Sequence, residues 1–227
     1  MAYPATFNVT LPEEFDKAQV VLRVVIVIVL SVLQVGNIIF GGAYLLLPVL
    51  AAILIAQKGP AQYLEEAEKG PTKWLRYLLG FYSYMALATD KLPTSASEEV
   101  VDLKVEPNGS PSVGSALIRI ILAIPHAIAL GLLGIIFAIC WIVAAIAILI
   151  NGTYPEWAAS FIRGYLRWTA RVMVYMASLV DEYPPFSFEG EVAGAPAPPA
   201  QPSTPEPAST VEPPAAPTAE GPGGSEG

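Results

Sequence analysis

The segment Ser115–Ile150, SALIRIILAIPHAIALGLLGIIFAICWIVAAIAILI, carries a single Lys or Arg, Arg119, and no acidic residue. As one straight helix it would be about 54 Å long at 1.5 Å per residue, whereas a bilayer's hydrocarbon core is about 30 Å thick. Two helices of about 18 residues fit this thickness better. Gly131 and Gly134, near the middle, tolerate the backbone angles of a reversal. The segment therefore predicts a helical hairpin over residues 115–150.

A second apolar segment, Val20–Ala56, has nearly the same length and again one charged residue near its start, Arg23. Residues that favour a turn lie near its centre, in Gln34–Asn37 and then in the pair Gly41-Gly42. The segment predicts a second hairpin over residues 20–56.

An amphipathic helix is expected after each hairpin, over residues 72–90 and 155–181. In the second helix three arginines are spaced four residues apart and share one face, opposite an aromatic and aliphatic face. Such a helix lies in the membrane interface with its arginines toward lipid headgroups, or it packs on the protein's own helices. Both interpretations stay open. The candidate headgroup contacts are Arg163, Arg167, Arg171, Lys73 and Arg76.

The two halves of the chain resemble each other. Leu75–Pro93 aligns without gaps on Leu166–Pro184, and seven of 19 positions are identical, including the run Tyr-Met-Ala-x-x-x-Asp-x-x-Pro. A repeat of this kind indicates a duplicated structural unit. We therefore predict an all-α integral membrane protein made of two tandem, parallel repeats, residues 20–93 and 115–192, with short β-strands outside the membrane.

The remaining segments are polar. Residues 1–19 form an N-terminal cytoplasmic segment, and residues 94–114 form a linker that contains a short strand at Val100–Glu106. This strand is expected to pair with either an N-terminal strand or Phe186–Val192. Residues 193–227 are rich in Pro, Ala and Glu, a composition that predicts a disordered tail.

Charge distribution predicts the orientation in the membrane. The net charge of -8, from 20 acidic and 12 basic residues, argues against nucleic acid as a partner because phosphate binding needs a basic surface. All Lys and Arg residues lie away from the expected hairpin tips, which predicts a multi-pass protein with both termini in the cytoplasm. The uncharged tips fit either a short extracytoplasmic turn or a hairpin that enters the bilayer and returns.

Three polar residues fall within the apolar segments and are candidate intramembrane functional groups: His126, Asn37 and Gln34. His126 follows Pro125, which removes a backbone hydrogen bond from a helix. A simpler role for its neutral imidazole is to satisfy a carbonyl freed by that kink. Asn37 and Gln34 are also explained by a hairpin turn.

Charged residues at the helix ends have structural interpretations. Arg23 and Arg119 are expected to act as interface anchors whose side chains extend to the headgroups. Asp90 and Asp181 are expected to terminate helices, or to pair with the arginines of the amphipathic helix.

Several motifs of the second half carry a family resemblance. These are Ala-Ile-Pro-His at 123–126, Ile-Leu-Ile-Asn-Gly-Thr-Tyr-Pro at 148–155, Leu-Arg-Trp at 166–168 and Asp-Glu-Tyr-Pro-Pro-Phe at 181–186. With them the sequence resembles a bacterial multipass membrane family known as domain of unknown function 4389, well over Val100–Glu189 and weakly in the first half. The resemblance implies a bacterial cytoplasmic membrane location and supplies no activity or catalytic residues.

No Walker loop, dinucleotide fingerprint, zinc-ligand spacing or nucleophile elbow occurs in the sequence, so we predict no enzyme, cofactor or metal site. The leading hypothesis is a non-enzymatic membrane scaffold or accessory subunit that binds membrane lipids, a membrane-protein partner or further copies of itself. One alternative is a small oligomeric transporter or channel component. Another is a membrane-shaping protein whose hairpins act as wedges.

Overall fold

The computed structural model describes residues 3–32, 35–93 and 100–189, and in this part of the chain it is mostly helical. These residues belong to one unit, Met1–Ala193, and the second unit, Gly194–Gly227, lies outside the described residues. The elements are β1 (Ala5–Asn8), α1 (Lys17–Val32), α2 (Val35–Lys58), α3 (Pro60–Glu65), α4 (Pro71–Met85), β2 (Asp102–Val105), α6 (Val113–Leu122), α7 (Ile124–Asn151) and α8 (Glu156–Met176).

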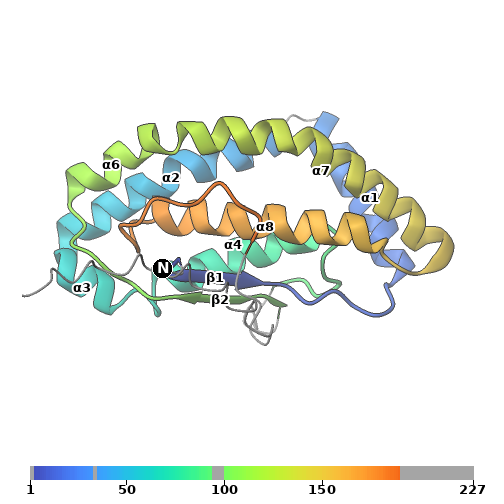
Figure 1. Cartoon of the computed structure of the whole chain (residues 1–227), viewed down its shortest axis with the longest axis horizontal. Helices are drawn as coiled ribbons and strands as arrows, with labels where there is room; N and C mark the ends of the chain where they lie inside the picture. The colour runs from blue at the N-terminus through green and yellow to red at the C-terminus, as the bar shows by residue number, and fades with distance from the viewer. Residues whose placement is uncertain (1–2, 33–34, 94–99, 190–227) are drawn as a thin grey trace, which may run out of the picture. The chain divides into compact units, whose positions relative to one another are not determined.

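The helices are arranged in layers within the first unit (Figure 1). The apolar helices α1, α2, α6 and α7 form one layer, in which α2 packs against α6 and α1 against α7. The amphipathic helices α4 and α8 pack against each other beneath them, and α8 also contacts β1. The two strands lie on the far side of α4 and α8 from α7.

The hairpin predicted over residues 115–150 is wrong. Helix α7 continues from Ile124 to Asn151, and Gly131 and Gly134 lie inside it without a reversal. The interruption comes instead at Ala123–Pro125, between α6 and α7, because the proline at the start of α7 has no N–H to continue the hydrogen bonds of α6. Glycine permits a reversal but does not require one.

The first apolar segment is divided into two helices, α1 and α2. Of the predicted turn residues, Gln34 lies outside the described residues. Asn37, Gly41 and Gly42 belong to α2, so the chain does not reverse at these three residues.

The two amphipathic helices end in the same way and earlier than predicted. After α4 the backbone of Leu87 is left-handed, with φ of 61°, and after α8 that of Ser178 is left-handed, with φ of 55°. Each helix is closed by the six-residue backbone hydrogen bond of a Schellman motif, from Ala88 N to Ser83 O (2.8 Å) and from Leu179 N to Val174 O (3.3 Å).

A two-stranded antiparallel sheet joins the two halves of the chain. β1 pairs with β2 in a register that places Phe7 opposite Leu103, and both side chains are buried. This confirms one of the two pairings predicted for the strand near residue 100. The other predicted partner, Phe186–Val192, is not a strand over its described part, residues 186–189.

Arg23 is fully buried at the first turns of α1, so its predicted role as an interface anchor is wrong. Its Nη2 lies 2.5 Å from Asp90 Oδ1, and its guanidinium stacks 4.0 Å from the centre of the Tyr84 ring. The other carboxylate oxygen of Asp90 accepts a hydrogen bond from Asp16 N. The pair thus ties the start of α1 to the chain just after α4.

Arg119 forms the matching pair in the second half and is 4% exposed. Its Nη2 donates to Asp181 Oδ1 at 2.7 Å, and its guanidinium lies 4.4 Å from the centre of the Tyr175 ring. Its Nη1 also donates to the carbonyl oxygens of Tyr175 and Val180. The predicted pairing of Asp90 and Asp181 with the arginines of the amphipathic helix is therefore wrong: both aspartates do form ion pairs, but with Arg23 and Arg119 of the apolar helices.

We expect Asp90→Asn to lower the free energy of unfolding by about 3–5 kcal/mol, because it leaves the buried Arg23 without a counter-charge. Asp181→Asn should cost less, because Asp181 is half exposed and Arg119 keeps two carbonyl partners. Thermal unfolding followed by circular dichroism in mild detergent measures both. The double variant Arg23→Met/Asp90→Asn should recover most of the loss, and an equal loss in both single variants would contradict the assignment.

Candidate functional site

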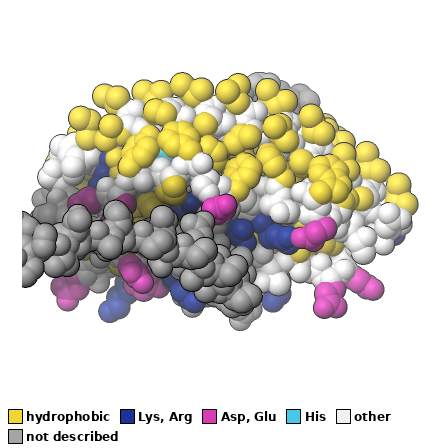
Figure 2. Space-filling model, viewed as in Figure 1, with side chains coloured by type: hydrophobic (Ala, Val, Ile, Leu, Met, Phe, Trp, Pro, Cys, Tyr) yellow, Lys and Arg dark blue, Asp and Glu magenta, His cyan; other side chains and the backbone are white. Residues whose placement is uncertain are grey.

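Exposed aliphatic side chains cover one side of the apolar helix layer. Figure 2 shows hydrophobic side chains gathered over the upper part of the molecule. Soluble monomers rarely expose apolar patches beyond a few hundred Å², so this surface indicates contact with lipid or protein. We call it the apolar face; it comprises Val21, Leu22, Val25, Ile28 and Val29 of α1, Leu45, Leu46, Val49, Leu50 and Ile53 of α2, Leu117, Ile118, Ile121 and Leu122 of α6, and Ile124, Ile128, Leu132, Ile135, Ile136, Ile139, Ile142, Ile146, Leu149 and Ile150 of α7.

Helix α7 has two distinct sides although nearly all of its residues are apolar. Its small inward residues, among them Cys140, Ala144 and Ala145, are buried, and this side of α7 packs against α8 and α1. All of its isoleucines except the buried Ile148 point outward and are exposed. Among the described helices, the continuous segment Val113–Asn151 is long and apolar enough to cross a membrane, with a mean hydropathy of 3.0 over its most apolar window.

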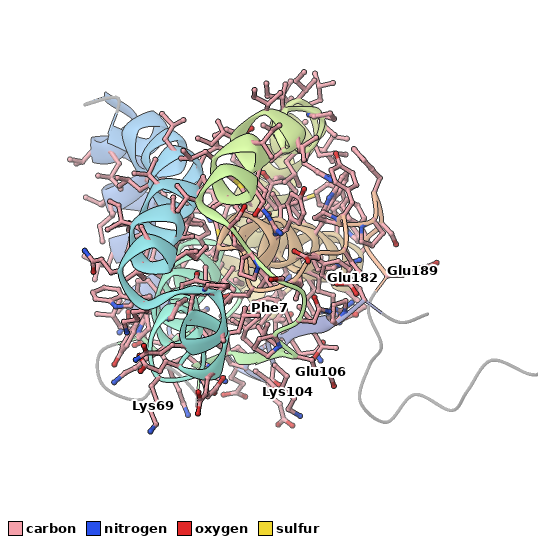
Figure 3. The ribbon with its side chains drawn as sticks, turned by 90° about the vertical axis from the view of Figure 1, so that its left-hand side faces the viewer. Phe7, Lys69, Lys104, Glu106, Glu182 and Glu189 are labelled. Carbon is pink, nitrogen blue, oxygen red and sulfur yellow. The ribbon has the colours of Figure 1, made fainter. Side chains whose placement is uncertain are left out.

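Charged side chains gather on the side away from the apolar face. In Figure 3, Lys69, Lys104 and Glu106 lie at the bottom of the view, and Glu182 and Glu189 lie at its right-hand edge. The molecule therefore separates an apolar layer from a charged one.

The arginines of α8 have partners within the protein. Arg163 pairs with Glu156 at 2.5 Å near the surface, and Arg167 donates to Asn8 Oδ1 at 3.2 Å. Arg171 is 6% exposed and donates to the carbonyl oxygens of Ser187 and Glu189; its burial lowers the pKa of its guanidinium. Of the two interpretations of this helix, packing on the protein's own elements is the one that the structure favours.

The two predicted headgroup contacts of α4 differ in their surroundings. Arg76 is 9% exposed, donates to Leu103 O and pairs with Glu68 at 2.5 Å, so it connects α4 to β2. Lys73 is exposed. Lys73 and the partly exposed Arg163 and Arg167 are therefore the predicted contacts that still reach the surface.

His126 is fully buried in a cluster of aromatic rings. Its Nδ1 accepts a hydrogen bond from Trp168 Nε1 at 3.0 Å, and its ring stacks on that of Phe186 with centroids 4.1 Å apart. The predicted bond to a freed carbonyl is therefore not what the described residues show, and Nε2 has no hydrogen-bond partner among them. The side chains of Asn37 and Gln34 lie outside the described residues, so their predicted grouping with His126 stays a prediction.

The segment 183–188 crosses α7 and α8 and encloses His126; we call it the aromatic strap. Tyr183 Oη donates to Leu122 O at 3.0 Å, and Phe186 packs on Trp168. Phe188 sits on Gly164, where a Cβ atom would come within 2.7 Å of the Phe188 side chain. The sequence analysis missed this role, although the aromatic spacing of Tyr-Pro-Pro-Phe-Ser-Phe is its visible signal.

A shallow depression of about 620 Å³ lies beside the strap, with Trp157, Arg167, Phe188 and Glu189 among its lining residues. The described residues contain no group of three or more His, Cys, Asp or Glu side chains that could hold a metal ion. The most extensive feature that could meet a partner is therefore the apolar face.

We expect Gly164→Ala to loosen the strap, because the added methyl group overlaps the Phe188 ring. The measurable result is faster limited proteolysis after residue 182 and a lower melting temperature in detergent. Gly131→Ala is the matched control, since nothing lies within 4 Å of its added Cβ, and alanine raises helix stability by about 0.5–1 kcal/mol. Equal protease resistance of the Gly164→Ala variant and the control would contradict the packing described.

Comparison with known protein families gives a match for the second half of the chain. The searches among curated proteins and among solved structures found no match. A family model described as Domain of unknown function (DUF4389) matches residues 114–187, which run from α6 through α8 into the aromatic strap. The resemblance noted in the sequence is thus confirmed over residues 114–187, about a third of the chain, which match the DUF4389 family model.

Proposed function

We propose that the protein is a non-enzymatic membrane protein that uses its apolar face to bind lipid and serves as a scaffold or accessory subunit. The observation that carries this proposal is the apolar face itself, which α1, α2, α6 and α7 present on one side of the molecule. Burial of apolar surface yields roughly 25 cal/mol per Å², so leaving this surface in water would be costly.

The placement of charge supports lipid as the partner. The apolar face contains no Lys, Arg, Asp or Glu side chain, and the two arginines within its helices, Arg23 and Arg119, are neutralised by buried ion pairs. An unpaired charge in hydrocarbon is expensive. A protein partner would not require so complete a removal of charge, whereas hydrocarbon does.

We also propose that the protein consists of two tandem repeats. The ion pairs Arg23–Asp90 and Arg119–Asp181 are built alike, because in each the guanidinium lies over a tyrosine ring. The left-handed residues Leu87 and Ser178 follow α4 and α8 at equivalent positions. These correspondences support a duplicated unit in which the two halves lie parallel, with both termini on the cytoplasmic side of a bacterial membrane.

The number of crossings is a separate question. A multi-pass arrangement, as the sequence predicted, is one way to place the apolar face in lipid, and insertion into a single leaflet is another. A transporter needs a polar path through the molecule, and the enclosure of His126 by Trp168, Tyr183 and Phe186 does not favour one at that residue. Membrane shaping stays an alternative function, because apolar helices inserted into one leaflet would displace lipid from that leaflet only.

We expect the double variant Ile135→Asp/Ile139→Asp to reduce flotation of the purified protein with phospholipid vesicles at least tenfold. Both side chains are on the apolar face, and an acidic residue costs about 2.5–3.5 kcal/mol at the bilayer centre and less near the interface. Leu92→Asp is the matched control, since Leu92 is 51% exposed but lies outside the apolar face. Undiminished flotation of the double variant, with helix content retained, would refute lipid binding by this face.

A further inference from the structure

We infer that the apolar face lies in the plane of one leaflet of a phospholipid bilayer and that α7 runs along the membrane rather than across it. This inference rests on the proposed function, since it specifies how the apolar face meets lipid. Three observations carry it: the charges beside the middle of α7, the course of the N-terminal segment, and the lengths of the helices.

The first observation is the position of α8. Tyr165, near the middle of α8, donates to Leu130 O and packs against Phe137, which lies at the centre of α7. Arg163 is two residues from Tyr165 and pairs with Glu156. The Arg163 side chain is 25% exposed and the Glu156 side chain 80% exposed. If α7 stood across the bilayer, Arg163 would lie within about one helical turn of the level of Phe137, inside the 30 Å hydrocarbon core, where a charged group is strongly disfavoured.

The second observation is that the extended N-terminal segment spans the length of α7 on the far side of α8. Tyr3 Oη donates to the carbonyl oxygen of Glu182, near the α6 end, and Phe15 N donates to Gly152 O just beyond the other end. Between these points lie β1 and the acidic residues Glu13 and Glu14. A crossing α7 would carry the open edges of the β1–β2 sheet into hydrocarbon, where such edges do not occur.

The third observation is length. α7 alone would measure about 42 Å at 1.5 Å per residue, and α6 precedes it with an interruption of one residue. This length exceeds the 30 Å core. A helix that lies in the interface has no such limit, and its apolar side enters the acyl region by about 5–10 Å. The one-sided exposure of α7, with isoleucines outward and small residues inward, fits this placement (Figure 2).

The test is a depth profile along α7 in the full chain. In a Cys140→Ser background, single cysteines replace Ile128, Ile139 or Ile150, all exposed on the apolar face, and carry an environment-sensitive fluorophore. Vesicles of phosphatidylcholine and phosphatidylglycerol contain nitroxide lipids with the spin label at a shallow or a deep acyl position. Lys104→Cys, on the charged side with a side chain 70% exposed, is the control.

We expect the three α7 positions to show equal depths, within about 5 Å, all in one leaflet. A crossing helix would place residue 139 deepest and residues 128 and 150 about 16 Å away from it toward opposite surfaces, and that profile would overturn the inference. With a crossing α7, the label at Lys104→Cys would still be unquenched, and the proposed function, lipid binding by the apolar face, would be retained. Absence of quenching at all three α7 positions would refute both this inference and the proposed function.

Discussion

Two buried guanidinium groups hold the apolar helices to the rest of the molecule. Arg23 lies in the second turn of α1 and Arg119 in the last turn of α6. Each needs a carboxylate because an uncompensated charge inside protein or lipid is very unfavourable. Asp90 and Asp181 supply it from the turns that follow α4 and α8. The ends of the amphipathic helices are therefore fixed by these arginines of the apolar ones, and the Schellman motifs present each aspartate after a fixed number of residues.

This arrangement allows a helix with almost no polar side chains to have a defined orientation. α7 is positioned by the size of its side chains: small residues and His126 face α8, and isoleucines face outward. The aromatic strap closes the remaining side by placing Phe186 and Phe188 against the histidine and against Gly164. The strap is itself held by Arg171, which binds its backbone carbonyls. Arg171, which was predicted to contact lipid headgroups, therefore holds the strap in place instead.

The sequence predicted those features that depend on residues close together in the chain. The apolar segments, the two amphipathic helices, the strand near residue 100 and the family resemblance of the second half all follow from composition, periodicity and short motifs. The reversal expected at Gly131 and Gly134 did not, because glycine makes a turn possible while only tertiary packing decides whether the helix continues. The partners of Arg23 and Arg119 were also missed: each lies more than 60 residues away in sequence, and snorkelling and ion pairing leave the same local pattern.

The register of the small sheet has an evolutionary consequence. Phe7 and Leu103 occupy equivalent positions in the two halves and face each other directly, so the pairs on either side, Thr6 with Lys104 and Asn8 with Asp102, exchange under a two-fold rotation. Two identical chains that meet across a two-fold axis pair in this manner. Under the proposed duplication, an ancestor with a single copy of this unit would have closed the same sheet as a symmetric homodimer. Fusion of the two genes would then have released each half to diverge in sequence.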